Sequence, residues 1–289
     1  MRQIPDSELI INPNGSIFHL HLLPEQIADT ILLVGDPGRV NQVSQKFNSI
    51  EHKVENREFV THTGTFNGKR ISVLSTGIGT DNIDIVINEL DALVNIDLKS
   101  RTVKEEKKSL NLIRIGTSGA LQEEIPVDSF VISAFGLGMD GLLNFYRHQW
   151  PETEALRKDF LAQTEWPATF NTPYLVRGSD SLREIIGEGM HTGITATACG
   201  FYGPQGRILR LGLHMPDLNE RLTNFKSGDW KVTNFEMETS ALFGLSSLLG
   251  HRSTTVCAII ANRIRKEYSK NYKIAVNNLI DTVLERISA

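Results

Sequence analysis

Short apolar runs alternate with amphipathic segments along the chain and predict its secondary structure. Thr30–Val34 is a continuous apolar run, the pattern of a strand buried on both faces. It stops at Gly35-Asp36-Pro37, whose aspartate can cap a following helix and whose proline suits the first helical turn. Ile71–Ser75 predicts a second strand, which the tight turn Gly77-Ile78-Gly79 separates from a helix expected over residues 83–94.

The rest of the chain repeats this plan. Leu112–Ile115 is a third apolar run, which we expect to end in the glycine-bearing turn 116–119. Phe130–Ile132 and Thr254–Ile260 predict further strands, and residues 271–287 predict a closing amphipathic helix. Strands that alternate with helices predict an α/β sheet with one continuous core.

Linker composition and charge refine the expected domain organisation. No proline-rich or serine-rich linker divides the sequence, so we expect a single domain over residues 1–289. Residues 97–108 are dense in charge and predict a solvated insertion, either a loop or an extension of the preceding helix. Residues 150–166 fit either a helix or a loop.

Composition excludes several classes of protein. The 289 residues are 40% hydrophobic and 22% charged, the balance of an ordinary globular protein. The net charge of −4 gives no basic field for nucleic acid. No apolar stretch approaches the roughly 20 residues of a membrane helix, and residues 1–15 lack the pattern of a secretory signal. Cys199 and Cys257 have no metal-type spacing, so we expect reduced thiols in a cytoplasmic protein.

Two arginines lie near predicted strand ends, where ligands of α/β sheets collect. Gly35 leaves its amide open to an oxyanion, and Arg39 offers a planar fork of donors suited to phosphate. A capped turn with a surface arginine is the alternative. Arg114 lies inside an apolar strand, where an unpaired guanidinium is costly, so either an internal carboxylate or an anionic ligand must meet it. Thr117 can add a hydroxyl at the same point.

Two further segments carry polar groups suited to a nucleoside. Glu236 and Glu238 precede a predicted helix, and either could cap it. Alternatively, a carboxylate there could accept hydrogen bonds from both hydroxyls of a ribose. Upstream, Phe201 could lie against a base, while Gln205 both donates and accepts and Arg207 only donates. The alternative is a loop with one packed aromatic side chain.

In combination these motifs resemble the nucleoside phosphorylase-I family, and within it the uridine phosphorylases. The resemblance spans nearly the whole chain, and its motifs are Ile17-Phe18-His19-Leu20, Gly35-Asp36-Pro37, Arg57-Glu58-Phe59, Ser75-Thr76-Gly77-Ile78-Gly79, Arg114-Ile115-Gly116-Thr117, Gln205-Gly206-Arg207, Phe235-Glu236-Met237-Glu238 and Ala261-Asn262-Arg263. Their order and combination are specific to the family. The resemblance implies the family fold, a central mixed, largely parallel twisted sheet flanked by helices.

The resemblance also implies a role for each candidate residue. Phosphate would be bound by Gly35, Arg39, Arg114 and Thr117, together with Arg57 from a neighbouring subunit. Ribose would be bound by Met237 and Glu238, together with His19 from the neighbour, and the base by Phe201, Gln205 and Arg207. Catalysis would depend on Arg114, Glu238, Gln205 and Arg207. Because two residues come from a second subunit, the resemblance implies at least a dimer, and known relatives are dimers or hexamers of dimers.

The implied activity is phosphorolysis of a pyrimidine nucleoside, in which uridine and phosphate give uracil and ribose 1-phosphate. Donors from Gln205 and Arg207 would stabilise the negative charge that grows on the departing ring. Inorganic phosphate is the co-substrate, and no organic cofactor or catalytic metal is implied. Some relatives bind a monovalent cation between subunits at positions that match Glu58, Ile78 and Asn82, although Asn82 replaces the usual serine. A structural cation therefore stays open.

Four competing functions differ in the residues that they require. Purine enzymes of the family carry an aspartate after the last strand, whereas Ile259–Asn262 has no acid. A hydrolytic nucleosidase needs a general base for water, whereas several arginines suit a dianion. A non-catalytic nucleoside-binding protein could keep the same fold. A dehydrogenase is disfavoured because Gly77-Ile78-Gly79 lacks the third spaced glycine.

Overall fold

A computed structural model describes residues 3–289. The strands are β1 (Thr30–Val34), β2 (Ser49–Asn56), β3 (Phe59–Phe66), β4 (Lys69–Ser75), β5 (Ile96–Asp97), β6 (Thr102–Val103), β7 (Asn111–Ala120), β8 (Phe130–Gly138), β9 (Tyr174–Arg177), β10 (His191–Thr197), β11 (Lys226–Ser227), β12 (Trp230–Glu236), β13 (Arg252–Asn262) and β14 (Glu267–Tyr268). The helices are α1 (Pro37–Ser44), α2 (Thr80–Asn95), α3 (Glu154–Gln163), α4 (Asp180–Ile186), α5 (Leu218–Asn224), α6 (Thr239–Leu249) and α7 (Tyr272–Ser288). Short 3-10 turns lie at Pro24–Gln26, Leu142–Phe145, Pro151–Thr153 and Gly203–Gln205.

One mixed sheet organises the part of the chain that is described. It has twelve strands, and β4, β1, β7 and β13 pair in parallel at its centre. A second parallel group, β8, β10 and β12, joins the first through the antiparallel pairs β13–β8 and β12–β7. Because β12 returns to β7, the strands β7, β13, β8, β10 and β12 close into a ring. This ring brings the carboxyl ends of β7 and β12 side by side.

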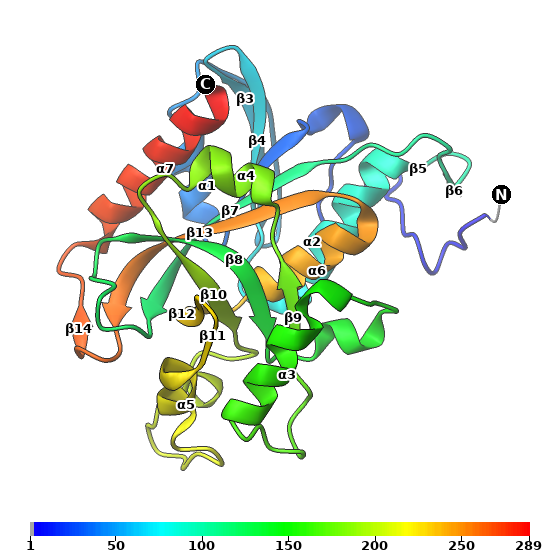
Figure 1. Ribbon diagram of the computed structural model, residues 1–289. Coiled ribbons are helices and arrows are strands. Elements are labelled where there is room, and N and C mark those ends of the chain that lie inside the picture. Colours follow the sequence, from blue (N-terminus) through cyan, green and yellow to red (C-terminus); the bar gives the residue numbers. More distant parts are fainter. Residues whose placement is uncertain (1–2) are drawn as a thin grey trace.

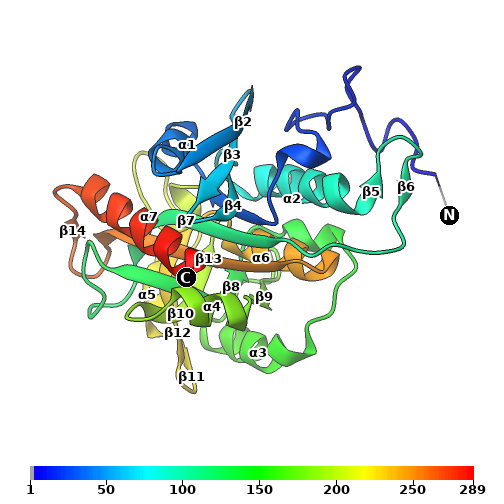
Figure 2. The ribbon, with the colours of Figure 1, turned by 90° about the horizontal axis from the view of Figure 1, so that it is seen from above.

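Alternating side chains of β1 explain why helices cover both faces of the sheet. Ile31 and Leu33 pack in a core cluster with residues of α2 and α6, whereas Leu32 and Val34 pack with residues of α1, α4 and α7. Figures 1 and 2 show α1 and α7 on one side of the central strands and α2 and α6 on the other. The expected α/β fold with a mixed sheet flanked by helices is therefore confirmed.

The turn that we expected at residues 116–119 is wrong, because β7 continues to Ala120. The glycine at 116 instead makes room for a side chain. A Cβ atom at Gly116 would lie 2.7 Å from Nη1 of Arg114 and 3.1 Å from Sγ of Cys257. Glycine in a strand often marks such a close approach rather than a strand end.

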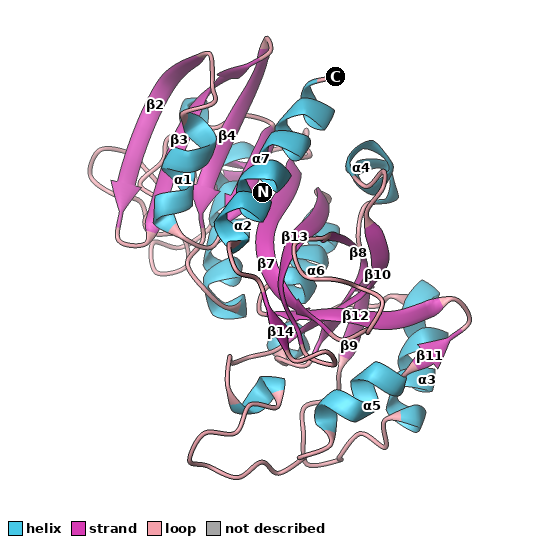
Figure 3. Ribbon diagram, turned by 90° about the vertical axis from the view of Figure 1, so that its left-hand side faces the viewer, coloured by secondary structure: helices cyan, strands magenta, loops and turns pink. Residues whose placement is uncertain are grey.

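The structure decides between the alternatives for residues 97–108 and 150–166. Helix α2 ends at Asn95, so residues 97–108 are not a helix extension. They include β6 and the second residue of its partner β5, and they are mostly exposed. Residues 150–166 contain α3, and the closing helix α7 begins and ends within one residue of the expected 271–287. Figure 3 shows α3, α5 and β11 at one end of the molecule and the β2–β3 hairpin at the other. Within residues 3–289, none of the helices has the length and apolar character needed to cross a bilayer.

Candidate active site

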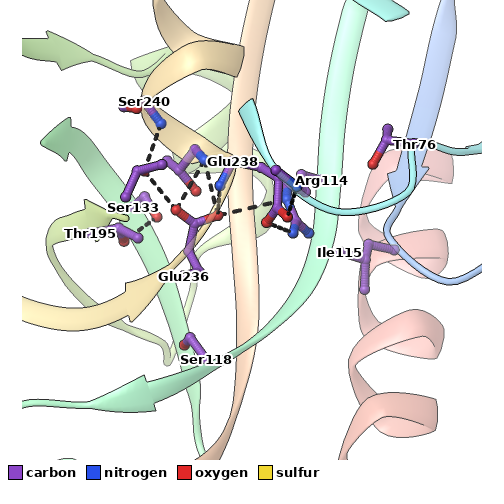
Figure 4. Close-up of polar contacts among 12 residues, drawn as sticks. Thr76, Arg114, Ile115, Ser118, Ser133, Thr195, Glu236, Glu238 and Ser240 are labelled. Carbon is purple, nitrogen blue, oxygen red and sulfur yellow. Dashed lines mark hydrogen bonds and ion pairs between the residues drawn. The ribbon is translucent and has the colours of Figure 1, made fainter. Parts of the chain in front are cut away.

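Arg114 occupies the centre of a buried ionic cluster between β7 and α6. Its Nη2 donates to Oε2 of Glu238, and its Nε lies 3.7 Å from Oε2 of Glu236. Figure 4 shows the side chain of Arg114 turned toward both carboxylates. Arg114 is 5% exposed and Glu238 3% exposed. The internal carboxylate that a buried arginine requires is therefore present.

The cluster retains hydrogen-bonding capacity that the chain does not use. Nε and Nη1 of Arg114 are buried and have no hydrogen-bond partner among the described residues. Although burial alone would lower the pKa of Arg114, Glu238 and Glu236 raise it above its ordinary value. The guanidinium is thus held in its charged form with two free donor groups, which is a suitable arrangement for a bound oxyanion.

Arg39 lies beside Arg114 and completes a pair of guanidinium groups. Asp36 caps α1 by accepting a hydrogen bond from the Gly38 amide at 2.8 Å, and this cap orients the first turn that carries Arg39. Nη1 of Arg39 lies 3.3 Å from the carbonyl oxygen of Ile115, in the strand that carries Arg114. Burial lowers the pKa of Arg39, and the positive charge of Arg114 lowers it further. Two neighbouring cations in a largely buried place favour an anion between them.

The other predicted phosphate ligands of this chain lie directly after β1 and within β7. Gly35 follows β1, and a Cβ atom there would lie 3.4 Å from the carbonyl oxygen of Gly77, so the loops after β1 and β4 are in contact. Thr117 lies three residues beyond Arg114 on β7 and is half-buried. The amide of Gly79 donates to Oε1 of Glu238 at 2.8 Å. The loop after β4 therefore fixes the second oxygen of the carboxylate that pairs with Arg114.

The predicted base-binding residues form a second cluster in the segment around the 3-10 turn Gly203–Gln205. The Arg207 guanidinium lies 3.7 Å from the centre of the Phe201 ring, and its Nη1 donates to Oε1 of Gln205 at 2.8 Å. Burial lowers the pKa of Arg207 to about 10, and the nearby charge of Arg263 contributes. In this arrangement the three residues interact with one another.

Arg263 is a further member of this cluster for which the motifs predict no role. Its Nη2 lies 3.5 Å from Oε1 of Gln205, and its Nε is buried with no hydrogen-bond partner among the described residues. Arg263 is the first residue after β13. A Cβ atom at Gly119 would lie 3.4 Å from this Nε, so the Arg263 side chain passes close to the carboxyl end of β7. The family motif Ala261-Asn262-Arg263 was the available signal, but only the fold shows that its arginine reaches Gln205.

His19 and Arg57 lie together, and within residues 3–289 no hydrogen bond or ion pair joins either of them to Arg114 or Glu238. The ring Nδ1 of His19 lies 2.6 Å from Oε1 of Glu89 on α2, whose carboxylate also accepts the amides of His19 and Leu20. Nδ2 of Asn56 donates to the His19 carbonyl at 2.8 Å. Arg57 follows Asn56 at the hairpin tip, has a φ of 54° and is exposed. Within residues 3–289 no hydrogen bond or ion pair engages its guanidinium.

Two of the three residues that match the cation positions are in contact. Nδ2 of Asn82 lies 3.3 Å from Oε1 of Glu58, and a Cβ atom at Gly77 would approach both side chains. The side chain of Ile78 is exposed. Asn82 thus supplies a donor to this carboxylate, and a bound cation stays a prediction.

A separate pocket of about 400 Å³ lies between the segment before α3 and β9. Its walls include His148, Trp150, Arg157 and Tyr174, with the His148 ring stacked on Trp150 at 4.4 Å. None of the predicted site residues lines it. The candidate site is therefore defined by its converging charged side chains and not by this pocket.

The fold and the ionic cluster define a family of proteins. A model of the phosphorylase superfamily matches residues 29–288, and the chain belongs to this superfamily. The chain is 32% identical to a uridine phosphorylase of Thermococcus kodakarensis over 265 residues, which cover 89% of this chain and 81% of the relative. It is also 29% identical to a DeoD-type purine nucleoside phosphorylase of Bacillus cereus, covering 92% of this chain and 97% of the relative.

A solved structure agrees closely over the whole fold. It is a Trypanosoma brucei nucleoside phosphorylase described as showing uridine phosphorylase activity. The TM-score is 0.88 at 30% identity, covering 97% of this chain and 100% of that structure. Since uridine and purine enzymes are both similar to this chain, the choice of base must be argued from individual residues.

Proposed function

We propose that this protein cleaves uridine with inorganic phosphate and releases uracil and ribose 1-phosphate. The observation that carries the proposal is the cluster of Arg39 and Arg114 beside Glu238, in which Arg114 keeps two buried donor groups without a partner. The two guanidinium groups bind the phosphate dianion, and Gly35 and Thr117 add an amide and a hydroxyl. The uridine phosphorylases among the relatives support this substrate.

The chemistry follows from the placement of charge. Glu238 and the half-buried Met237 bind the ribose, and the carboxylate accepts hydrogen bonds from the two sugar hydroxyls. A phosphate oxygen forms a bond to C1′ while the bond from C1′ to N1 breaks, and its electron pair moves into the uracil ring. Holding phosphate and sugar together makes the attack effectively intramolecular. Inorganic phosphate is the co-substrate, and the proposed reaction requires no organic cofactor or catalytic metal.

The base cluster stabilises the leaving group. Gln205, Arg207 and Arg263 present hydrogen-bond donors, which become stronger partners as negative charge develops on uracil. Phe201, which is 50% exposed, provides a face on which the ring can stack once Arg207 moves from it. The Arg207–Gln205 pair therefore opens when the base binds.

Asn262 favours a pyrimidine over a purine. It ends the stretch Ile259–Asn262, which has no acid where purine enzymes of the family carry an aspartate, and its side chain is fully used inside the protein. Nδ2 donates to the carbonyls of Gln122 and Ile125 at 2.9 and 2.8 Å, and Oδ1 accepts the amides of Ile264 and Arg265 at 2.9 and 2.8 Å. No proton donor for a purine ring is available from this residue.

A nucleoside panel with and without phosphate tests the function. Uridine, deoxyuridine, thymidine, cytidine and inosine are incubated with the protein, and free base and ribose 1-phosphate are quantified. Uracil release that requires phosphate supports the proposal. Turnover without phosphate would indicate a hydrolase, rapid inosine cleavage with inert uridine a purine enzyme, and uridine binding without turnover a binding protein.

The complete site is formed by two subunits of a homodimer. His19 and Arg57 are held next to each other by Asn56, and Arg57 has a free guanidinium and a left-handed backbone that only a few non-glycine residues adopt. Both residues extend into the site of the neighbouring subunit, where Arg57 reaches phosphate and His19 the 5′-hydroxyl. Both cysteines are free, which agrees with the reducing cytoplasm.

Subunit complementation tests the shared site. Arg57→Ala and Arg207→Ala are each expected to lose most activity as homodimers. When the two variants are co-expressed, each mixed dimer contains one site with both arginines, so about a quarter of all sites are intact. Recovery of about a quarter of the wild-type rate supports the dimer, and a rate that stays at the sum of the two variants contradicts it.

A further inference from the structure

Helix α6 is capped in an unusual way. Glu238 occupies its N-cap position, where a side-chain oxygen normally accepts one of the first helical amides, yet Glu238 makes no such bond. Glu236, the last residue of β12, does so in its place. Its Oε2 accepts the amide of Glu238 at 2.9 Å, and both its oxygens accept the amide of Thr239, at 3.0 and 2.9 Å.

Because Glu236 caps α6, the carboxylate of Glu238 is available for other contacts. Oε1 of Glu238 accepts the Gly79 amide at 2.8 Å, and Oε2 pairs with Arg114. If Glu238 had to cap its own helix, its carboxylate would turn back toward the first turn of α6 and away from Arg114. Glu236 therefore carries the capping function, and Glu238 is directed into the site.

Glu236 is itself fixed by the neighbouring strand. The Thr197 hydroxyl donates to its Oε1 at 2.7 Å and accepts the Ser240 amide at 2.9 Å. Thr197 and Glu236 are partners in the parallel β10–β12 register, so the hydroxyl and the carboxylate meet at the same level of the sheet. Figure 4 shows Glu236 between Thr195 and Ser240 on one side and Glu238 on the other.

The charge of Glu236 also acts on Arg114. Its Oε2 lies 3.7 Å from Nε of Arg114, too far for a hydrogen bond but close enough for a strong attraction in a buried site. The titratable groups that face it are Glu238 and Arg114 at closest range, with the thiol of Cys257 on β13 and the phenol of Tyr174 on β9 beyond them. Tyr174 in turn donates to Asp140 at 2.7 Å.

We propose that Glu236 is a positioning residue for phosphorolysis, whose ionised carboxylate caps α6 and orients Arg114 so that Glu238 stays directed at the sugar. This inference rests on the proposed function. It assigns Glu236 no contact with substrate. Its effect on the reaction passes through Arg114 and Glu238.

The ionisation of Glu236 is consistent with a role in function and not in stability. Burial, and then the charge of Glu238, raise the pKa of Glu236 from 4.5 to about 7. A folded-state pKa above the unfolded value means that the folded protein binds this proton more tightly. The contribution of Glu236 to stability is therefore largest below pH 4.5 and is lost as the pH rises through about 7. Above that pH the ionised group is a cost to the fold.

Glu236→Gln separates the charge from the cap. Glutamine keeps the shape and one acceptor for the amides of α6, but it cannot attract Arg114. The matched control is Glu184→Gln, an exposed position on α4. At pH 8 we expect Glu236→Gln to lower kcat/KM about tenfold to a hundredfold while its melting temperature equals or exceeds that of the wild type. Glu184→Gln should match the wild type in both measurements.

The pH profile gives the readout that a merely structural role would not change. Phosphate gains a proton in the same pH range as Glu236. On the acid side of the profile, kcat/KM of the wild type should therefore decrease with two protonation events and that of Glu236→Gln with one. Binding of inorganic phosphate, measured by calorimetry across the same pH range, should show the same difference and does not depend on turnover.

The outcomes distinguish this inference from the proposed function. A Glu236→Gln variant with the wild-type rate and profile would overturn the positioning role, as would a rate loss that merely follows a lower melting temperature. A wild type without phosphorolysis would overturn the proposed function alone, and the phosphate-binding profiles of the two proteins would still decide the role of Glu236.

Discussion

The ionic cluster and the base cluster both belong to the proposed site but are built differently. Arg114 lies within β7, Glu236 ends β12 and Glu238 occupies the N-cap position of α6. All three are almost fully buried, and backbone amides and the register of β10 and β12 fix the two carboxylates. Phe201 and Arg207 belong to a loop between β10 and α5 and are exposed or half-buried.

This difference shows which part of the site is ready for its ligand. Arg114 keeps unpartnered donors, so phosphate can bind without breaking an internal hydrogen bond of that guanidinium. Arg207 instead bonds Gln205 and covers Phe201, so these contacts must part before a base can enter. Under the proposed function, the sugar and phosphate end would be preorganised, whereas the base end is closed on itself and would have to rearrange.

Removing Arg114 should have the largest effect, because the ionic cluster depends on it. Arg114→Ala is expected to lower kcat/KM by at least about 10³-fold, since phosphate loses a charged donor and Glu238 its orientation. It also leaves two buried carboxylates uncompensated, so the free energy of unfolding should fall by about 3–5 kcal/mol. Phosphorolysis assays and denaturant unfolding measure both. Arg252→Ala, at an exposed position on the adjacent β13, is the control. An Arg114→Ala variant whose kcat/KM stays within about tenfold of the wild-type value would contradict the site.

Removing Arg207 should affect the reaction but not the fold. Arg207→Ala is expected to lower kcat/KM about 10²-fold, because the departing ring loses a donor. The side chain is half-buried in a loop, so the free energy of unfolding should change by less than about 0.5 kcal/mol. The exposed neighbour Arg210 supplies the control, Arg210→Ala. A large loss of stability in Arg207→Ala would show that the two clusters are not built differently.

The smallest effect on activity is expected at Asn262, where the family resemblance would place the choice of base. Asn262→Asp should not create inosine phosphorolysis, because the side chain is directed at Gln122, Ile125 and the following turn. The aspartate cannot donate to those two carbonyls, so the free energy of unfolding should fall by about 1–3 kcal/mol. Inosine turnover comparable to uridine turnover in this variant would show that position 262 reaches the base.

Much of the fold could be predicted because its signals are local. The apolar run Thr30–Val34, the Asp36 cap and the closing helix each depend on neighbouring residues, and the structure agrees with all three. The prediction failed at Gly116, where a glycine was interpreted as a turn. A glycine stands at position 116 because Arg114 and Cys257 need the space. Cys257 lies on a strand more than a hundred residues away, so this requirement has no local signal in the sequence.

For the candidate site, sequence by itself determined the chemical inventory: which arginines and carboxylates are present, and that a buried Arg114 needs a partner. Only the tertiary structure decided the pairings. Arg114 and Glu238 are 124 residues apart and meet because β12 returns to β7, and the same closure lets Glu236 cap α6 in place of Glu238. Side-chain chemistry is a property of each residue, whereas convergence depends on strand register and on the ring that β7 and β12 close.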